Sequence, residues 1–413
     1  MCRRRAVISA GACTGRALHG RHYALAAETR PESEKHMQTR FVFSAPGRTE
    51  LSGNHTDHQH GCVLAAAVNL ETTAEVRLNG TDVIRVASEG YAPVEINLHD
   101  LRVHEDEKNT TAALIRGVAA EFVRRGANVQ GFDAAVRSSV LPGSGLSSSA
   151  AFEVLIGTIL NELFFGKSLT AVEIAQIGQY AENVYFGKPC GLMDQTASSV
   201  GGMVFIDFRN PTRPVVEKLA FDFEKTGYAL CIIDSRADHA DLTDEYAAIP
   251  AGMCAVARVF GKHVLRDVPE EDFYARLPEV RKQCGDRAVL RAMHFFAENR
   301  RVQAQAAALR TGDFAEFLRL VNESGRSSWM YLQNIMPAGA SAHQEMGVTL
   351  ALCQKLLNGR GACRVHGGGF AGTAQAFVPA DMLENFKAGV EAVLGAGSCH
   401  VLSIRQAGGI RVE

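Results

Sequence analysis

A run of glycines and serines in the first half of the chain constrains the fold more than any other feature. It spans residues 141–149, follows a strand-like segment at 132–140, and precedes a helical pattern at 150–164. Glycines let the backbone approach an anion closely, and the free N–H groups at a helix start stabilise phosphate. The sequence therefore predicts a strand, a phosphate-binding loop and a helix, in that order.

This loop does not match two common nucleotide motifs. It lacks the final Gly-Lys-Ser/Thr of a Walker A loop. It also lacks the third glycine of the dinucleotide fingerprint, and no acidic residue closes a second strand about 20 residues later, which disfavours a dehydrogenase. Taken alone, the loop also fits a glycine turn before a serine-capped helix that binds nothing.

A second polar segment, 47–61, carries an arginine, three histidines and an aspartate between glycines. His55, Asp57, His58 and His60 are competent metal ligands, but neighbouring strand positions face opposite sides and no histidines have helical i, i+4 spacing. A sugar-binding loop fits better, with Asp57 and His55 as hydrogen-bond partners for hydroxyls and Arg48 as fixed charge. A merely solvated polar loop is the remaining alternative.

A third segment, 366–372, is His-Gly-Gly-Gly-Phe-Ala-Gly. It looks like the oxyanion element of lipases, but it lies near the end of the chain, where that element should precede a G-x-S-x-G elbow, and no such elbow occurs. The segment fits a glycine-rich turn between strands at 362–366 and 373–378 that is able to close over a ligand.

Taken in chain order, the segments 47–61, 141–149 and 366–372 resemble the three motifs of the GHMP kinases. The first segment, Ala45-Pro46-Gly47-Arg48 through His55-Thr56-Asp57, is similar to the galactokinase signature within that family. A further stretch, 190–195, looks like the galactokinase segment that carries a catalytic aspartate, and 238–246 matches in kind. The resemblance runs from about residue 40 to 410.

The resemblance implies an ATP-dependent sugar 1-kinase of the galactokinase type. Asp194 is the expected base for the C1 hydroxyl of galactose, and Arg48 the expected stabiliser of charge. The residues expected to hold the sugar are Asn54, His55, Asp57, Gly191 and Tyr246. The residues expected to wrap the triphosphate of ATP are Gly143, Ser144, Gly145, Leu146, Ser147, Ser148 and Ser149. Ser149 and Glu182 are expected to bind Mg²⁺.

Position 54 departs from this pattern, because galactokinases usually have Glu there, facing the C6 hydroxyl, and Asn-Leu-Ile-Gly before it. Asn54 retains an acceptor, gains donors and loses the charge, so it also tolerates a carboxylate. Galactose is the expected substrate, with galacturonate, N-acetylgalactosamine or another altered hexose as alternatives. A non-catalytic sugar sensor on the same fold is a remote alternative, since the catalytic aspartate and the loop are both present.

The implied fold is α/β (α+β) with two lobes, and the active site lies in the cleft between them. Residues 1–36 are expected to be a loosely ordered extension, or to precede a true start at Met37. Residues 37–225 are expected to form the ribosomal-protein-S5-like N-terminal domain, and 226–413 a ferredoxin-like C-terminal domain. A chain of 413 residues is long enough for two such units.

Charge, apolar runs and cysteine content limit the classes of partner and the location that the sequence supports. With 43 Lys+Arg against 45 Asp+Glu, the net charge gives no reason to expect nucleic acid or an anionic membrane. No apolar run approaches the roughly 20 residues that span a bilayer. Ten scattered cysteines without CxxC spacing indicate free thiols of a reducing cytoplasm. The expected state is a cytoplasmic monomer or weak homodimer.

Overall fold

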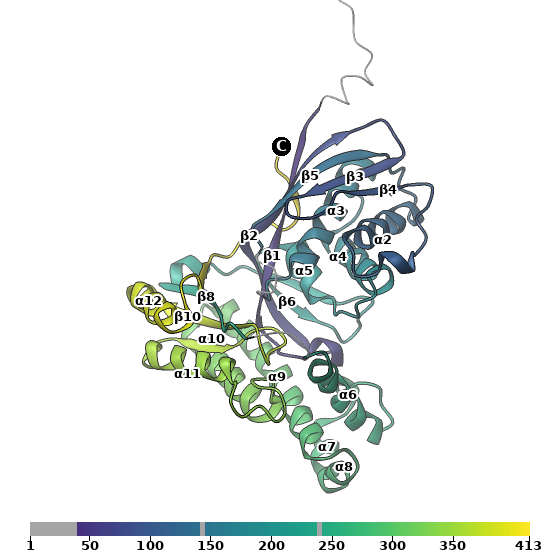
Figure 1. Ribbon diagram of the computed structural model, residues 1–413. Coiled ribbons are helices and arrows are strands. Elements are labelled where there is room, and N and C mark those ends of the chain that lie inside the picture. Colours follow the sequence, from purple (N-terminus) through teal and green to yellow (C-terminus); the bar gives the residue numbers. More distant parts are fainter. Residues whose placement is uncertain (1–38, 141–144, 238–241) are drawn as a thin grey trace, which may run out of the picture.

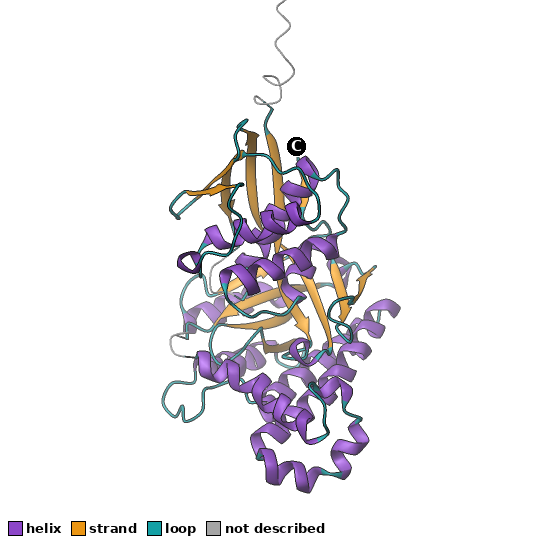
Figure 2. Cartoon of the chain, turned by 90° about the vertical axis from the view of Figure 1, so that its right-hand side faces the viewer, coloured by secondary structure: helices purple, strands orange, loops and turns teal. Residues whose placement is uncertain are grey.

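The computed structural model describes residues 39–140, 145–237 and 242–413 of the chain. Two β-sheets and their helices form two parts stacked along the long axis of the molecule (Figures 1 and 2). The first part holds the strands numbered β1 to β7, and the second part is mainly helical around a smaller sheet. The mixed α/β class expected from the sequence is therefore confirmed.

The first sheet has eight strands and is built around one long strand, β2. The N-terminal half of β2 pairs with β6 and its C-terminal half pairs with β5, while β1 runs along nearly its whole length. The order is β12-β1-β2-β5-β3-β4, with β6 on β2 and β7 on β6. The strands are β1 Phe41–Ser52, β2 Cys62–Leu78, β3 Val83–Ser88, β4 Val94–Asn97, β5 Phe132–Ser138, β6 Met203–Asp207, β7 Val215–Leu219 and β12 Ile410–Arg411.

Strand β1 is longer than the sequence indicated. The sequence pattern predicted an end of this strand at Ala45-Pro46-Gly47, but the strand continues to Ser52 through a register shift between Pro46 and Arg48. A bulge at this point absorbs the proline, which has no N–H to donate to the sheet. The polar segment that follows Arg48 is therefore partly a strand, which fixes the direction of its side chains.

Two helices of the first part were predicted from the spacing of apolar residues and are observed. The helix expected at 111–125 is α2, Thr111–Arg124, and the helix after the glycine loop is α3, Ser148–Phe164. Next come α4 (Ala171–Tyr180), which begins with a capping box, the π-helix η3 (Ala181–Phe186) and α5 (Met193–Val200). An apolar cluster between α2, α3 and the sheet includes Phe43, Phe122 and Ile156, each with no exposed surface.

The second sheet has the order β11-β8-β10-β9, with every neighbouring pair antiparallel. Its strands are β8 Tyr228–Asp234, β9 Ala362–Val365, β10 Thr373–Pro379 and β11 Cys399–Leu402. Counted along the chain, this is fourth, first, third, second, with helices after the first and third strands. That is the split β-α-β-β-α-β arrangement of ferredoxin-like domains.

Helices fill the long connection between β8 and β9 and the shorter connection between β10 and β11. The longest, α9, crosses the second part and packs against both α6 and α10. These helices are α6 Thr243–Val259, α7 Glu270–Ala275, α8 Leu277–Cys284, α9 Asp286–Thr311, α10 Phe314–Ser327, α11 Glu345–Leu357 and α12 Leu383–Leu394. The remaining short helices are η1 Asp57–Gln59, η2 Glu105–Glu107, η4 Phe223–Thr226, η5 Leu265–Asp267, η6 Ser328–Leu332 and η7 Ala380–Met382.

The two parts share a core and a strand. One apolar cluster joins Leu51 and Leu64 of the first sheet to Leu230, Phe317 and Phe377 of the second part. The end of the chain returns to the first sheet, where β12 pairs with β1. The division at 225/226 stays a prediction, and these last residues lie with the first sheet despite their position in the sequence.

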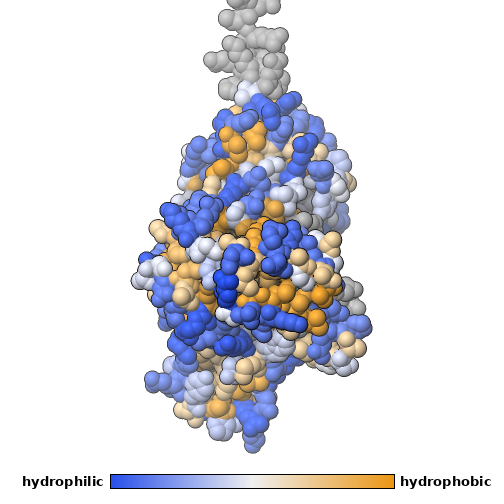
Figure 3. All heavy atoms as spheres, turned by 90° about the vertical axis from the view of Figure 1, so that its left-hand side faces the viewer, coloured by the Kyte–Doolittle hydropathy of each residue, from blue (hydrophilic) through white to orange (hydrophobic). Residues whose placement is uncertain are grey.

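The surface over the second part is mixed. Seen from the side on which α12 lies, apolar residues gather near the middle of the molecule between hydrophilic ones (Figure 3). Within the described ranges, no helix combines the length and the apolar character needed to cross a membrane.

We expect the shared core to carry much of the stability. Phe317 has no exposed surface, and its ring lies 5.3 Å from that of Phe377 in an edge-to-face contact. Phe317→Ala should lower the free energy of unfolding by about 3–5 kcal/mol, because it leaves a cavity between the two parts. Chemical denaturation measures this, with Val393→Ala, at a position 59% exposed, as a control. Equal effects of the two changes would contradict this account.

Candidate active site

The phosphate loop predicted from the sequence lies between β5 and α3. Residues 145–147 lead into the helix, with Gly145 and Ser147 both at positive φ, 70° and 57°. Ser148 and Ser149 form the first turn of α3, where the backbone N–H groups have no partners within the helix. Leu146 is buried and its carbonyl accepts a hydrogen bond of 3.0 Å from the backbone N–H of Arg48. Gly143 and Ser144, also predicted to bind ATP, lie outside the described residues.

Arg48 and Asp194 form the central ion pair of the site. Arg48 Nε donates to Asp194 Oδ1 at 2.6 Å, and a terminal nitrogen donates to Oδ2 at 2.5 Å. The other terminal nitrogen donates to the carbonyl of Gly145, and Ser147 Oγ donates to Asp194 Oδ2 at 2.8 Å. Residues predicted from three separate segments therefore meet on one carboxylate, at the first turn of α5.

The surroundings of Asp194 keep it ionised. Burial raises the pKa of this carboxyl, but the charge of Arg48 and the hydrogen bonds from Arg48 and Ser147 outweigh burial, so the net pKa lies below the ordinary value. At neutral pH the group is a carboxylate held in one orientation. Such a group can orient a hydroxyl and accept its proton as the oxygen becomes bonded elsewhere.

The predicted metal ligands are in contact with each other. Ser149 Oγ lies 3.3 Å from Glu182 Oε1, and Lys188 Nζ lies 3.3 Å from the same oxygen. Gln195 Nε2 donates to Glu182 Oε2 and to Glu153 Oε2, both at 2.9 Å. Hard oxygen ligands with a carboxylate among them fit a magnesium ion, and the ammonium group shows that a cation is accommodated at this oxygen.

Sequence reasoning missed Glu153, Lys188 and Gln195. Glu153 stands four residues after Ser149 on α3, so the i, i+4 spacing of a helix face was a usable signal. Gln195 follows Asp194 directly and also carried a signal, since it lies within the stretch matched to the family. Nothing in the local sequence marked Lys188, because its partner is defined only by how the loop after η3 folds back.

Gly191 and Asp57 lie against each other. A Cβ at position 191 would come 2.1 Å from Asp57 Oδ2, so only glycine lets the two chains approach this closely. Burial raises the pKa of Asp57 to about 6, and the negative charges of Glu50 and Asp194 add to that shift. Asp57 is therefore a carboxylate at neutral pH that becomes protonated in mild acid.

The glycine turn between β9 and β10 was predicted and is observed. Three side chains of the predicted sugar site bind its carbonyls. Asn54 Nδ2 donates to Gly367 O at 2.6 Å, the Tyr246 hydroxyl donates to Gly369 O at 2.9 Å, and His55 Nε2 lies 3.0 Å from Gly368 O. The turn thus joins the first polar segment to the helix α6 that carries Tyr246.

Asn54 is fully buried, and both the nitrogen and the oxygen of its side-chain amide are hydrogen-bonded within the protein. Its nitrogen donates to Gly367 O and, at 3.3 Å, to Glu50 Oε1. Its oxygen accepts from Ser328 at 3.2 Å and from Asn334 at 2.8 Å. In this arrangement no polar group of Asn54 is left for a sugar, so a direct sugar contact stays a prediction that requires these bonds to be exchanged.

Two of the three histidines of the segment 47–61, His55 and His58, form a neutral pair, because burial lowers the pKa of both. His55 Nδ1 lies 3.2 Å from His58 Nε2, and burial lowers the pKa of His58 to about 3. Across the described ranges no group of three His, Cys, Asp or Glu residues is arranged to hold a metal ion.

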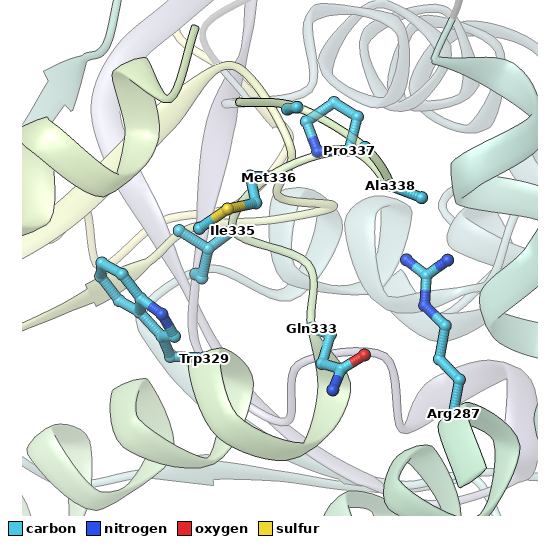
Figure 4. A pocket seen from close by; sticks show the side chains of 9 residues that line it. Arg287, Trp329, Gln333, Ile335, Met336, Pro337 and Ala338 are labelled. Carbon is cyan, nitrogen blue, oxygen red and sulfur yellow. The ribbon is translucent and has the colours of Figure 1, made fainter. Parts of the chain in front are cut away.

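Two hollows lie near these residues. A cavity of about 310 Å³ adjoins the start of α3 and is lined by Thr72, Tyr91, Ser138, Ser148 and Phe152. A second, of about 280 Å³, is formed by Arg287 and by Trp329, Gln333 and the loop 335–340, whose side chains surround it in Figure 4. The first adjoins the phosphate loop, whereas the second lies beyond Asn334.

Comparisons with known proteins identify the fold. Residues 113–202 match the N-terminal domain of the GHMP kinases. A crystal structure of Lactococcus lactis galactokinase in complex with galactose superimposes with a TM-score of 0.76 at 24% identity, covering 91% of this chain and 95% of that one. A mevalonate kinase superimposes with a TM-score of 0.61 at 15% identity, covering 88% and 99%. The fold is that of the GHMP kinases.

More similar sequences narrow the family further. Residues 33–78 match the galactose-binding signature of galactokinases. The galactokinase of Streptomyces coelicolor is 33% identical over 362 residues, 86% of this chain and 87% of that protein. The galactokinase of Actinobacillus pleuropneumoniae is 33% identical over 358 residues, 83% and 86%. This chain belongs to the galactokinase family and is a sugar kinase.

The environment of Asn54 leads to a prediction about stability. Glu50 is buried and pairs with the fully buried Arg364, so a glutamate at 54 would place two carboxylates side by side. Asn54→Glu alone should destabilise the fold by about 3–5 kcal/mol, and Glu50→Asn alone by a similar amount, because Arg364 loses its partner.

The double variant Glu50→Asn/Asn54→Glu should recover at least half of the summed loss, since the carboxylate remains near Arg364. Chemical denaturation of the four proteins gives the coupling energy. Simple addition of the two single effects would show that Glu50 and Asn54 do not share one charge site.

Proposed function

We propose that this chain transfers the γ-phosphoryl group of ATP to the C1 hydroxyl of galactose, forming galactose 1-phosphate and ADP. The observation that carries the proposal is the Asp194 carboxylate, held by Arg48 and Ser147 at the mouth of the phosphate loop. The similar proteins from Streptomyces coelicolor and Actinobacillus pleuropneumoniae, both named galactokinases, support galactose as the acceptor.

Asp194 orients the C1 hydroxyl and accepts its proton. The sugar oxygen forms a bond to the γ-phosphorus, the bond from that phosphorus to the bridging oxygen breaks, and ADP leaves with the electron pair. Because the reaction needs little covalent help from the protein, positioning and charge stabilisation supply most of the catalysis. Arg48 holds the carboxylate in place and supports the negative charge that develops beside it.

The phosphates of ATP would lie at residues 143–149, where the free N–H groups at the start of α3 face them. The cavity that adjoins Ser148 and Phe152 is of a size for the nucleoside end of ATP. Ser149 and Glu182 would hold Mg²⁺, which would neutralise charge on the β- and γ-phosphates.

The sugar would lie between Asp57, His55, Gly191 and Tyr246. The close approach of Gly191 to Asp57 supports this location, because it places the Asp57 carboxylate against backbone without a side chain and within the field of Asp194. The specific observation that favours a second substrate is the amide at position 54, where the family pattern has a carboxylate. Galacturonate or N-acetylgalactosamine is therefore the alternative acceptor.

Two further proposals concern the protein as a whole. All eight cysteines of the described ranges are free, which supports a reducing cytoplasm as its location. A monomer or weak homodimer is proposed from the sequence alone.

The function is tested by ADP release with ATP and a panel of galactose, galacturonate, N-acetylgalactosamine, glucose and arabinose. Galactose should give the highest kcat/KM. Asp194→Asn should lower kcat by about 1,000-fold because the proton acceptor is lost. Asp381→Asn, an exposed partner of Arg360, is the control and should leave kcat unchanged.

A preference for galacturonate or N-acetylgalactosamine would leave the mechanism in place and correct the substrate. ADP release that does not depend on any sugar, or binding of sugar and ATP without turnover, would contradict the kinase proposal. The second result would favour a sensor.

Activity should also depend on pH through Asp57. With its pKa raised to about 6, Asp57 is protonated below that pH, loses its charge and becomes a weaker acceptor of hydrogen bonds from sugar hydroxyls. The KM for the sugar should therefore rise as pH falls below about 6, with kcat less affected. Asp57→Asn should show a high KM without this pH dependence. A KM in the wild-type protein that is constant from neutral pH to mild acid would rule out this role.

A further inference from the structure

Lys188 is folded back onto the proposed metal ligand. It lies in the loop after η3, where Gly187 has a φ of 86° and turns the chain. The backbone N–H groups of Gly187 and Lys188 both donate to Glu182 O, at 3.0 and 3.1 Å. The ammonium group lies 3.3 Å from Glu182 Oε1, and 61% of its side chain is exposed. The lysine is thus fixed at its backbone and free to move at its tip.

Its ammonium group uses the oxygen that a metal ion would need. Glu182 Oε1 contacts both Ser149 Oγ and Lys188 Nζ, while Oε2 is held by Gln195. A divalent cation bound by Ser149 and Glu182 would repel an ammonium group at the same oxygen. Binding of the metal therefore requires the tip of Lys188 to leave Glu182 while its backbone stays at the phosphate site.

Arg48 does not have a nitrogen to spare for a phosphate in this arrangement. Its Nε and one terminal nitrogen bind Asp194, and the other terminal nitrogen binds the carbonyl of Gly145. In the described chain, the ion pairs of Asp194 and Glu182 are with Arg48 and Lys188. Lys188 is thus the cation at this site that can change its partner.

We propose that Lys188 is a further catalytic residue, which binds Glu182 while the nucleotide site is empty and contacts the γ-phosphate of ATP once the metal has entered. This inference rests on the proposed kinase function and extends it. The compact ammonium group, on a long flexible stem, offsets negative charge on the transferring group as the bond to ADP breaks.

The test compares Lys188→Met and Lys188→Arg with the control Lys225→Met, an exposed lysine paired with Asp222. The affinities for ATP and ADP are measured by calorimetry in excess magnesium without sugar, and kcat and KM are measured with galactose. Lys188→Met should lower kcat by about 100-fold. It should also weaken the binding of ATP about 10-fold more than the binding of ADP. Lys188→Arg should recover most of both, and the control should match the wild type.

A second readout separates this role from a structural one. A residue that only supports Glu182 would, when replaced, weaken ATP and ADP equally, or give a kcat that added magnesium restores. Either result would overturn the proposal.

The ATP-to-ADP affinity ratio does not depend on which sugar is phosphorylated. A wild-type protein inactive on galactose, combined with a changed ratio in Lys188→Met, would refute the proposed substrate and support the lysine. An unchanged ratio, combined with normal galactose turnover, would refute the lysine alone.

Discussion

The ion pair between Arg48 and Asp194 is the interaction on which the rest of the site depends. It joins the long strand β1, the first turn of α5 and, through Ser147 and Gly145, the phosphate loop. Asp194 is half-buried, and a carboxylate withdrawn from water in this way is tolerated only where charges and donors compensate the loss of water. The same contacts that make its burial possible also fix its orientation, so structural support and catalytic positioning are one arrangement.

Beyond this pair, polar side chains continue along β1 into the second part of the molecule. Glu50 pairs with Arg364, Ser52 donates to Glu298, and Asn54 binds the glycine turn. Buried polar groups need partners with suitable geometry, so this layer specifies how the two parts meet more strictly than the shared apolar core does. The same layer includes position 54, where this chain has an asparagine and the family pattern has a glutamate. The hydrogen bonds of the Asn54 amide lie within this layer.

Much of the fold could be predicted from the sequence because it depends on local patterns. The helix after the glycine loop and the strand at Tyr228–Asp234 follow from periodicity and from glycines at their ends. The continuation of β1 past Pro46 was missed, since a bulge is defined by the partner strand. The short β12 was missed because a strand of two residues is too short to show an alternation of apolar and polar residues. The roles assigned to Asp194 and Tyr246 came from resemblance to a family. No local pattern encodes the hydrogen bonds that occupy the whole amide of Asn54, or the contact of Lys188 with Glu182, because both depend on tertiary neighbours.

The pairing of β12 with β1 has a consequence for the order of folding during synthesis. Val42 and Glu413 are joined by backbone hydrogen bonds, and Phe43 is paired with Arg411. The first sheet, which carries the phosphate loop, therefore lacks its edge strand until the ribosome has released residues some 370 positions later in the chain. Contacts of such long sequence separation form late and slow the completion of folding. The nascent chain must carry an open sheet edge while the second part is made, a period in which a chaperone that covers exposed strands would have most effect.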